Sequence, residues 1–384
     1  MRGQLRYLRS LDELRSESLA WDDLWYRSGT SAPAARAELI AQWIETFGPK
    51  ADFQALVVES EGQLVAALPL VGGRKAKLLR VGMLPRNEWA RCGDLLWDSA
   101  AGAEALDLIV QGLRRLPWGV MWFDGVALDE PHWQDFVKAL GRARLPWKSH
   151  IQMRFGVVDC RGDWADLQAA WSKNHRHNMR GAARKAASAG EVKLQVRRDF
   201  ASPQEVAELV RRGFEVEDRS WKGTSGDSSV LKTAGMLDFF TRQAQQLADW
   251  NQLQLVFLEL DGRPMAFEFG WLAKGVYFTP KVGYDETFAR LSPSQLLRYE
   301  LFQRFHEEQD VQFVDFAGEQ TDALTKWTTG DYPIGRLVFG CGSLFSRAIM
   351  KGYDHFRASR KTCTTKSPAR NPRLPSPAPV PNHT

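Results

Sequence analysis

The chain has 384 residues, of which 44% are hydrophobic and 25% charged, a composition typical of a globular protein and a length that suits two domains. It contains no run of about 18 uncharged apolar residues, so we expect no membrane span. The formal net charge is only +5, and much of this excess lies in the C-terminal tail, which argues against a nucleic-acid partner.

The cysteines and the two ends of the chain suggest no specialised chemistry. Cys92, Cys160, Cys341 and Cys363 lie far apart and form no metal-type or redox-type pair. The first residues, MRGQLRYLRSLDELRSE, contain no continuous apolar segment of the kind found in a signal peptide. We therefore expect a cytoplasmic protein with reduced thiols and no metal. Residues 360–384 are rich in Pro, Ser and Arg, which predicts a disordered tail.

One plan of elements occurs twice along the chain. In each half, two β-rich runs are joined by an acidic residue and a glycine, at Glu61-Gly62 and at Asp261-Gly262, which predicts two hairpins because glycine accepts positive φ. A third strand, a helix and a short fourth strand follow each time. The strands are predicted at 53–60, 63–73, 76–84 and 119–126, and again at 253–260, 263–272, 275–284 and 311–318, with helices at 103–116 and 294–308. The repetition predicts two similar α/β halves, although two unrelated α/β halves are an alternative.

The joint between the halves lies near residues 150–165. Beyond it, residues 163–190 predict one long helix that ends at Gly190. A second helix is predicted over 202–217, with Ser202 as its N-cap and Pro203 in its first turn.

The start of the second-half helix is the first candidate site. Ser292 is placed to be the N-cap, Pro293 occupies the first helical position, and Gln295 completes a capping box. Amide N–H groups without intrahelical partners and the helix dipole suit such an end to a pyrophosphate, and Arg290 could add a direct charge contact. Pro280 interrupts the strand that leads into this loop, and a strand that stops pairing opens a wedge for a ligand. A well-capped helix that binds nothing is the alternative.

The segment from about Trp164 to Phe339 resembles the CelD-type acetyltransferase domain of the GNAT superfamily. The matching pieces are, in order, WSKNHRHNMRGAARKA, RSWKG, LELDGRPMAFEFG, YDETFARLSPSQLL and VQFVDFAGE. The resemblance implies a mixed, splayed β-sheet with acyl-CoA, such as acetyl-CoA, lying in the splay. It also implies that the loop 290–295, with Ser292 and Ser294, replaces the superfamily's glycine-rich pyrophosphate loop.

The expected fold class is therefore α/β, with two tandem GNAT-like domains, each a mixed, splayed sheet flanked by helices. Residues 1–150 resemble the family's N-terminal half only in outline, so we expect a degenerate GNAT-like domain over residues 1–155. The acyltransferase domain with the acyl-CoA site is expected over residues 156–345.

Two carboxylates are candidates for catalysis. Glu268 is the only charge in the apolar run from Pro264 to Leu272, and burial there would raise its pKa and suit it to act as a general base. Asp315 lies in the apolar strand at 311–318, and the same argument applies to it. The alternatives are a glutamate on an exposed sheet face and an aspartate that caps a neighbouring turn.

The expected substrate-binding residues come from three of the matching regions. Arg219, Trp221 and Lys222 combine a guanidinium, an aromatic ring and an ammonium, which could line a pocket for an anionic or sugar-like acceptor. A surface loop with a buried tryptophan is the alternative. Tyr284 opens the piece YDETFARLSPSQLL, and Lys326 lies where the family carries an aromatic–lysine pair.

A basic stripe runs along the helix predicted before Gly190. It consists of Lys173, Arg176, Arg180 and Arg184, which follow at helical spacing. A solvated face is the usual explanation, and contact with a phosphorylated substrate or carrier is the alternative. His175 and His177 are two residues apart and point away from each other on a helix, so we assign them no shared metal and no catalytic role.

Three functions are compatible with these patterns. The leading one is transfer of an acyl group from CoA to an amine or hydroxyl of a small molecule, sugar or polysaccharide precursor, by direct attack in a ternary complex, because no G-x-S-x-G elbow or activated cysteine is present. The second is transfer of an aminoacyl group from tRNA, as in the similar FemAB-type tandem GNAT enzymes. The third is a non-catalytic double-GNAT binding protein in polysaccharide assembly.

Overall fold

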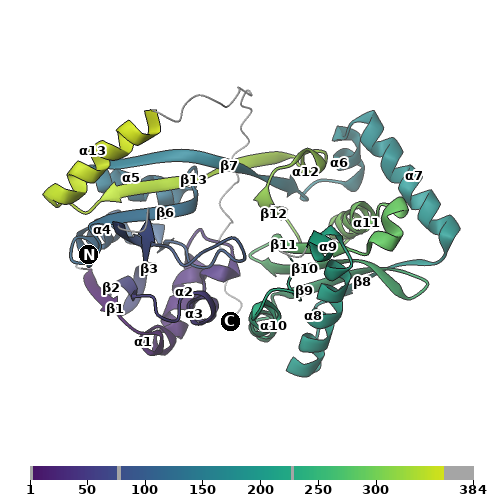
Figure 1. Cartoon of the computed structure of the whole chain (residues 1–384), viewed down its shortest axis with the longest axis horizontal. Helices are drawn as coiled ribbons and strands as arrows, with labels where there is room; N and C mark the ends of the chain where they lie inside the picture. Colours follow the sequence, from purple (N-terminus) through teal and green to yellow (C-terminus); the bar gives the residue numbers. More distant parts are fainter. Residues whose placement is uncertain (1–2, 76–78, 226–228, 359–384) are drawn as a thin grey trace. The chain divides into compact units, whose positions relative to one another are not determined.

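The computed structural model describes residues 3–75, 79–225 and 229–358 (Figure 1). The tail predicted at 360–384 lies outside these residues. The chain divides into two compact units: unit 1 comprises residues up to Arg154 together with the chain from Tyr332 onward, and unit 2 comprises Phe155–Asp331. Strands β7 (Trp147–Asp159) and β13 (Gly330–Gly340) each contribute residues to both units.

The end of unit 2 differs from the boundary expected at residue 345. Most of β13 belongs to unit 1, because it pairs antiparallel with β6 (Val120–Ala127) from Ile334↔Ala127 to Gly340↔Val120. The sequence of β13 carries no sign of this partner, which lies about two hundred residues earlier in the chain.

Unit 1 has a mixed sheet in the order β1-β2-β3-β4-β6-β13, with β5 paired to β3. A buried aliphatic and aromatic cluster joins this sheet to α4 and α5. Besides β6 and β13, its elements are β1 (Gln4–Leu8), α1 (Leu11–Ser16), α2 (Ser18–Arg27), η1 (Pro33–Ala35), α3 (Ala37–Phe47), β2 (Phe53–Ser60), β3 (Gln63–Lys75), β4 (Leu79–Met83), β5 (Leu96–Trp97), η2 (Ser99–Ala101), α4 (Glu104–Leu113), α5 (Pro131–Arg142) and α13 (Leu344–Ala358).

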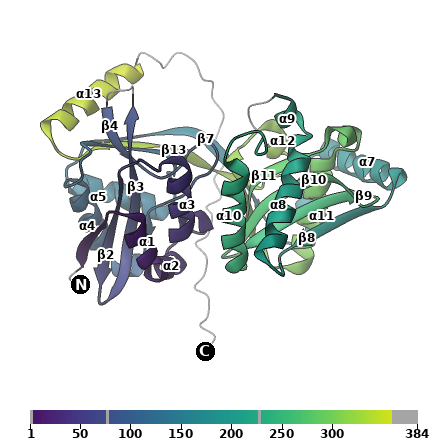
Figure 2. The same ribbon diagram turned by 60° about the horizontal axis from the view of Figure 1, so that its bottom comes forward.

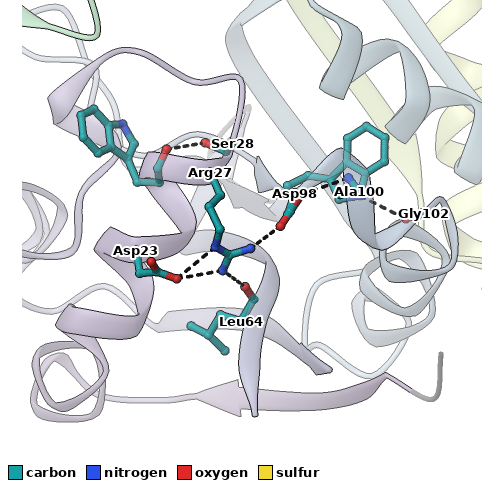
Figure 3. A network of polar contacts seen from close by, with 9 residues as sticks. Asp23, Arg27, Ser28, Leu64, Asp98, Ala100 and Gly102 are labelled. Carbon is teal, nitrogen blue, oxygen red and sulfur yellow. Dashed lines mark hydrogen bonds and ion pairs between the residues drawn. The ribbon is translucent and has the colours of Figure 1, made fainter. Parts of the chain in front are cut away.

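One arginine ties helix α2 to the sheet of unit 1 (Figure 3). The guanidinium of Arg27 donates to the backbone oxygen of Leu64 at 2.6 Å and to the carboxylates of Asp23 and Asp98. Asp98 in turn accepts a hydrogen bond of 3.0 Å from the backbone N–H of Ala100. A planar donor with five N–H groups can satisfy several acceptors at once, so this side chain holds three separate segments together.

Unit 2 has a mixed sheet in the order β7-β12-β11-β10-β9-β8. Its further elements are α6 (Trp164–Ala170), α7 (Lys173–Ala189), β8 (Val192–Arg197), α8 (Pro203–Asp218), α9 (Trp221–Ser225), α10 (Met236–Asp249), β9 (Leu253–Leu260), β10 (Arg263–Ala273), β11 (Val276–Tyr284), η3 (Glu286–Leu291), α11 (Pro293–Glu308), β12 (Phe313–Glu319) and α12 (Asp322–Thr325).

The repeated plan is present in both units. The turns at Glu61-Gly62 and Asp261-Gly262 have positive φ at both residues, 54° and 79° in the first and 49° and 76° in the second, as a two-residue type I′ hairpin requires. The strand before each central helix pairs parallel with the strand after it, β4 with β6 and β11 with β12. Each unit is therefore a mixed sheet with the same order of hairpin, strand, helix and parallel strand.

The sheet of unit 2 is covered on both faces. Helices α8 and α10 cover one face (Figure 2). There, Phe214 of α8 and Phe240 of α10 pack against Phe269 of β10, with ring centroids 6.1 and 5.8 Å away. On the other face, Phe305 of α11 packs against Tyr277 of β11 at 5.0 Å. Side chains that alternate along β10 therefore enter two different cores.

The helix predicted over 163–190 is two helices. Trp171 has an extended backbone, with φ −69° and ψ 151°, and separates α6 from α7. Ser172 then caps α7 by accepting the backbone N–H of His175 at 3.1 Å. The end at Gly190 is confirmed. Ser172 was a possible cap, but the buried positions Leu167, Trp171 and Met179 keep helical spacing across it and concealed the break.

Candidate functional site

Strands β11 and β12 pair over a short distance only. Their parallel register covers Val276↔Phe313, Tyr277↔Val314 and Phe278↔Asp315. Pro280, which lacks a backbone N–H, lies two residues beyond Phe278, while β11 continues to pair with β10 as far as Tyr284. The ladder between the two parallel strands therefore ends at Phe278, well before β11 itself ends at Tyr284.

Asp285 fixes that loop. It is fully buried, and its Oδ1 accepts from the backbone N–H and the hydroxyl of Thr287, at 2.9 and 2.6 Å. Its Oδ2 accepts from Arg219 at 2.7 Å and lies 3.3 Å from a guanidinium nitrogen of Arg263. Burial alone raises the pKa of Asp285, but the hydrogen bonds from Thr287 and Arg219 outweigh it and hold the pKa below its usual value. The carboxylate thus anchors the segment that carries Arg290 and Ser292.

The predicted capping box at the start of α11 is wrong. Ser292 has left-handed φ and ψ of 57° and 51° and makes no side-chain capping bond. Its backbone N–H bonds to Ala289, and the side chain of Gln295 turns away to accept a hydrogen bond of 2.9 Å from the indole N–H of Trp327. Pro293 occupies the first helical position as predicted.

A cavity of about 760 Å³ lies beside this helix start. It is bordered by α7, by the loop and first turn of α11, and by the segment around α12. Four of its described lining residues are Lys or Arg, two are His, and none is acidic. The lining residues are His175, His177, Asn178, Met179, Gly181, Ala182, Arg184, Lys185, Ser188, Arg290, Ser292, Gln295, Ala323 and Lys326. Backbone N–H groups at a helix start, together with surrounding cations, suit an anionic group such as a phosphate.

His175 is enclosed at the edge of this cavity. Its ring lies 4.8 Å from that of Trp171 and 4.7 Å from that of Trp327, edge to face in both cases. Only 5% of the residue is exposed, and in the described part of the chain its Nε2 has no hydrogen-bond partner. Burial lowers the pKa of His175, and the nearby Lys326 ammonium lowers it further, so the imidazole is neutral near pH 7.

His175 was missed at the sequence level. With Met179, Ala182 and Ala186 it forms the buried stripe of α7, at spacings of four, three and four residues. That period was the available signal, because it places His175 on the inner face of the helix, opposite the exposed Arg180.

Glu268 lies outside the described lining of this cavity. The residue is fully buried in β10, and its Oε1 accepts a hydrogen bond of 2.8 Å from the hydroxyl of Tyr277. Burial raises the pKa of Glu268, while the positive charge of the buried Arg298 on α11 and the Tyr277 hydroxyl act in the opposite direction. The carboxyl group therefore faces the core between the sheet and α11.

Asp315 lies in β12 and supports a local bend. Its Oδ1 accepts the backbone N–H of Ala317 at 2.7 Å, and Ala317 has a positive φ of 49°. The pairing of β12 with β7 is interrupted between Asp315 and Glu319, at the same place. This geometry matches the turn-capping alternative for Asp315.

The expected substrate-binding residues separate into two groups. Arg219 is paired with Asp285, and Lys222 donates to the buried Glu217 at 2.8 Å and to the backbone oxygen of Val282 at 2.9 Å. Trp221 is 55% exposed, and Tyr284 is half-buried at the end of β11. Ser294, which was expected to bind the cofactor, is half-buried in the first turn of α11. Of all the predicted site residues, the structure brings Arg290, Ser292, Gln295 and Lys326 together around one cavity.

Comparisons with known proteins agree with this architecture. Residues 173–327 match the family model described as an acetyltransferase (GNAT) domain. The match lies wholly within unit 2 and includes every residue that lines the cavity. The chain therefore contains an acetyltransferase domain of the GNAT superfamily, and such a domain implies an acyl-CoA co-substrate. No curated protein sequence matches the chain.

Solved structures resemble nearly the whole chain in fold. The crystal structure of FemX has a TM-score of 0.58 at 10% identity, covering 91% of this chain and 99% of FemX. The C-terminal domain of a putative lysylphosphatidylglycerol synthetase from Agrobacterium fabrum has a TM-score of 0.52 at 13% identity, covering 88% and 96%. At these identities the likeness concerns the fold alone.

No group of three or more His, Cys, Asp or Glu side chains in the described ranges of the chain is placed to hold a metal ion. Within the same ranges, no helix combines the length and hydrophobicity that crossing a bilayer requires.

Proposed function

We propose that this protein is an acyl-CoA-dependent acyltransferase that binds the phosphates of its donor in the cavity beside α11. The observation that carries the proposal is the lining of that cavity, where Arg290 and Ser292 meet Lys326 and no described acidic side chain intervenes. A polyanion gains from the cations, from the N–H groups of the helix start and from the helix dipole together. An acidic residue in the lining would offset much of that gain.

The transfer is proposed to be direct. Burial raises the pKa of the Cys160 and Cys341 thiols to about 12, so neither thiol ionises appreciably near neutral pH. An amine or hydroxyl of the acceptor therefore attacks the thioester carbon itself. As the new bond forms, the C–S bond breaks and the thiolate of CoA leaves. An acetyl group is the proposed cargo.

His175 is our candidate for the group that takes the acceptor's proton. The bare Nε2 of a neutral imidazole can accept a proton, and the surroundings of His175 keep its ring neutral. Glu268 is instead assigned a positioning role, because its carboxyl group is bonded to Tyr277 and faces Arg298 beneath α11.

The acceptor is proposed to enter through an adjoining cavity of about 490 Å³, which shares Lys326 with the first. Hydroxyl groups of Ser172, Thr325, Thr328 and Thr329 and the carboxylate of Asp322 border it. Such a lining suits a small hydroxylated or amino-bearing molecule such as a sugar or a polysaccharide precursor.

Isothermal titration with acetyl-CoA tests the donor site. We expect micromolar binding by the wild type and a loss of about tenfold or more in Arg290→Ala, because a charge contact to phosphate is removed. Arg304→Ala is the control, since Arg304 lies on α11, the helix that follows Arg290, but bonds to Glu308 and is absent from the lining. Equal affinities of the two variants for acetyl-CoA would show that the phosphates do not bind in this cavity. If the wild type did not bind acetyl-CoA at all, an acyl-CoA donor would be excluded.

A second function is favoured by the length of the cavity along α7. Arg184 and Lys185 continue the basic lining along α7, which suits a longer polyanion such as an aminoacyl-tRNA donor. Titration with aminoacylated tRNA at increasing salt separates the two donors. The second function would be favoured if the protein bound tRNA with an affinity that falls steeply with salt and did not bind acetyl-CoA.

A further inference from the structure

Helix α13 exposes two large apolar side chains in its first turn. Leu344 is 85% and Phe345 67% exposed, whereas most large apolar side chains of the described chain are buried. Complete burial of a side chain of this kind would contribute about 1.5–3 kcal/mol, which the two exposed side chains do not gain. Two adjacent side chains of this kind mark a surface that gains from an apolar partner.

The opposite face of α13 is held firmly on unit 1. Met350 belongs to a small buried cluster with Val81, Val120 and Val338. The ring of Tyr353 packs edge to face on Trp122 at 5.6 Å. These contacts fix the orientation of the helix, so Leu344 and Phe345 remain on its outer side.

Cations lie on the same outer face. Arg347 follows Leu344 by three residues and Lys351 by seven, so both lie on the side of the helix that carries Leu344, and both are exposed. Over residues 344–353, whose burial is described, the remaining exposed positions are the small residues Ala348 and Gly352. The face therefore has an apolar tip at the start of the helix and basic side chains one and two turns further on.

The charge of the chain is concentrated in this region. From Leu344 to the last residue there are eight Lys or Arg and one acidic residue, whereas the preceding sequence has 43 basic and 45 acidic residues. The eight are Arg347, Lys351, Arg357, Arg360, Lys361, Lys366, Arg370 and Arg373. Clusters of four to eight cations beside an amphipathic helix attract anionic lipid headgroups by about 1 kcal/mol each near the surface.

We propose that the outer face of α13, formed by Leu344, Phe345, Arg347 and Lys351, docks the protein on a bilayer that contains anionic lipid. The two apolar side chains enter the boundary between headgroups and acyl chains, and the basic residues contact phosphate groups. A second copy of the chain is a poorer partner, because the same basic segments would face each other. A nucleic acid offers phosphates but no place for the aliphatic side chain of Leu344. The proposal is independent of the transfer chemistry.

Co-sedimentation of the full chain with vesicles tests the proposal. We expect binding to vesicles of phosphatidylglycerol and phosphatidylcholine in equal parts, little binding to pure phosphatidylcholine, and a decline at high salt. Leu344→Glu combined with Phe345→Glu should weaken binding to the mixed vesicles by about tenfold or more, since both insertions are lost. Glutamate suits the first turn of a helix, so the variant keeps α13.

Leu19→Glu is the matched control. Leu19 is 88% exposed on α2 but follows Glu17 and precedes Asp22 and Asp23, so its surroundings are acidic. Its replacement should leave vesicle binding unchanged. Equal binding by the wild type and the double variant would overturn the proposal, as would indifference to anionic lipid.

Two further measurements exclude the other partners. A double variant that changes a dimer to a monomer in light scattering, with no effect on vesicles, would assign this face to a second copy. Loss of RNA binding without loss of vesicle binding would assign it to a nucleic acid.

Discussion

The indole N–H of Trp327 donates a hydrogen bond of 2.9 Å to Oε1 of Gln295, which ties the segment after α12 to the first turn of α11. Trp327 is fully buried and also packs against His175. The proposed phosphate site and the enclosed imidazole are therefore connected through one side chain. We therefore expect a change at the helix start to affect His175 through this ring.

Gln295→Ala should destabilise unit 2 and weaken the donor site together. The substitution leaves the buried indole N–H of Trp327 without an acceptor, at a cost of about 1–3 kcal/mol. We expect urea denaturation to show this loss, and titration with acetyl-CoA to show weaker binding because the first turn of α11 is no longer held.

Ser294→Ala is a suitable control for that experiment. Ser294 lies beside Gln295 but outside the described lining of the cavity. If Gln295→Ala were as stable as Ser294→Ala, the hydrogen bond to Trp327 would not hold the helix start.

Much of the fold could be predicted from local signals. An acidic residue followed by glycine specifies a tight turn by its own φ preferences, so the hairpins at Glu61-Gly62 and Asp261-Gly262 were visible in the sequence. The capping box at Ser292 was not, because Gln295 bonds to Trp327, a partner 32 residues away. A local sequence pattern can be overridden by a tertiary contact, and the partner in such a contact lies outside the neighbouring residues from which the pattern is read.

Replacing Glu268 should separate a positioning role from a role as base. Glu268→Ala leaves the Tyr277 hydroxyl without its acceptor and the buried Arg298 without its counter-charge, so we expect a loss of about 3–5 kcal/mol in urea denaturation. Glu268→Gln keeps the shape and an acceptor oxygen, so its loss should be smaller. A Glu268→Gln protein with full stability and full donor binding but no transfer would show that the carboxylate acts as the base.

The location of charged side chains was harder to predict than their burial. The apolar run around Glu268 correctly indicated a buried carboxyl group, but only the tertiary fold shows that α11 covers that face. Arg219 and Lys222 were expected to bind an acceptor, but both are paired within the protein. Arg219 pairs with Asp285, which is distant in sequence, and Lys222 pairs with Glu217, five residues earlier. The sequence shows which side chains are charged. Which of them form ion pairs depends on how whole helices and strands pack together.

The pKa of His175 predicts a pH dependence of stability. Because burial and Lys326 lower that pKa in the folded state, the unfolded chain binds more protons as the pH falls below the ordinary value of about 6.5. The contribution is complete above that value and is lost as the pH falls. We expect the free energy of unfolding to decrease as the pH falls below about 6.5, and His175→Phe to reduce that decrease.

Lys326→Gln provides an independent test of the same coupling. Removing the ammonium should raise the pKa of His175, which can be followed by the chemical shifts of its ring protons. In a transfer assay, the acidic limb of the pH profile should move to higher pH in this variant. An unchanged titration would show that the two side chains do not interact.

Gly270→Ala should be one of the most damaging small substitutions in unit 2. A Cβ at this position would lie 2.3 Å from the hydroxyl of Tyr277 and 2.5 Å from its ring, although the backbone of Gly270 is not left-handed. Tyr277 is fully buried and packs against Phe305, so its ring has no room to retreat. The hydroxyl must then leave Glu268. Overpacking costs about 1–3 kcal/mol, and the lost bond to a carboxylate adds about 1.5–3 kcal/mol.

Gly141→Ala on α5 separates this steric effect from the ordinary effect of replacing glycine. A Cβ there would meet nothing within 4 Å, so the substitution should stabilise the helix by about 0.5–1 kcal/mol. Urea denaturation of both variants gives opposite signs if Gly270 exists to admit the Tyr277 ring. Two small effects of the same sign would show that the sheet yields at β10, and the hydrogen bond between Tyr277 and Glu268 would then contribute little to holding α11 in place.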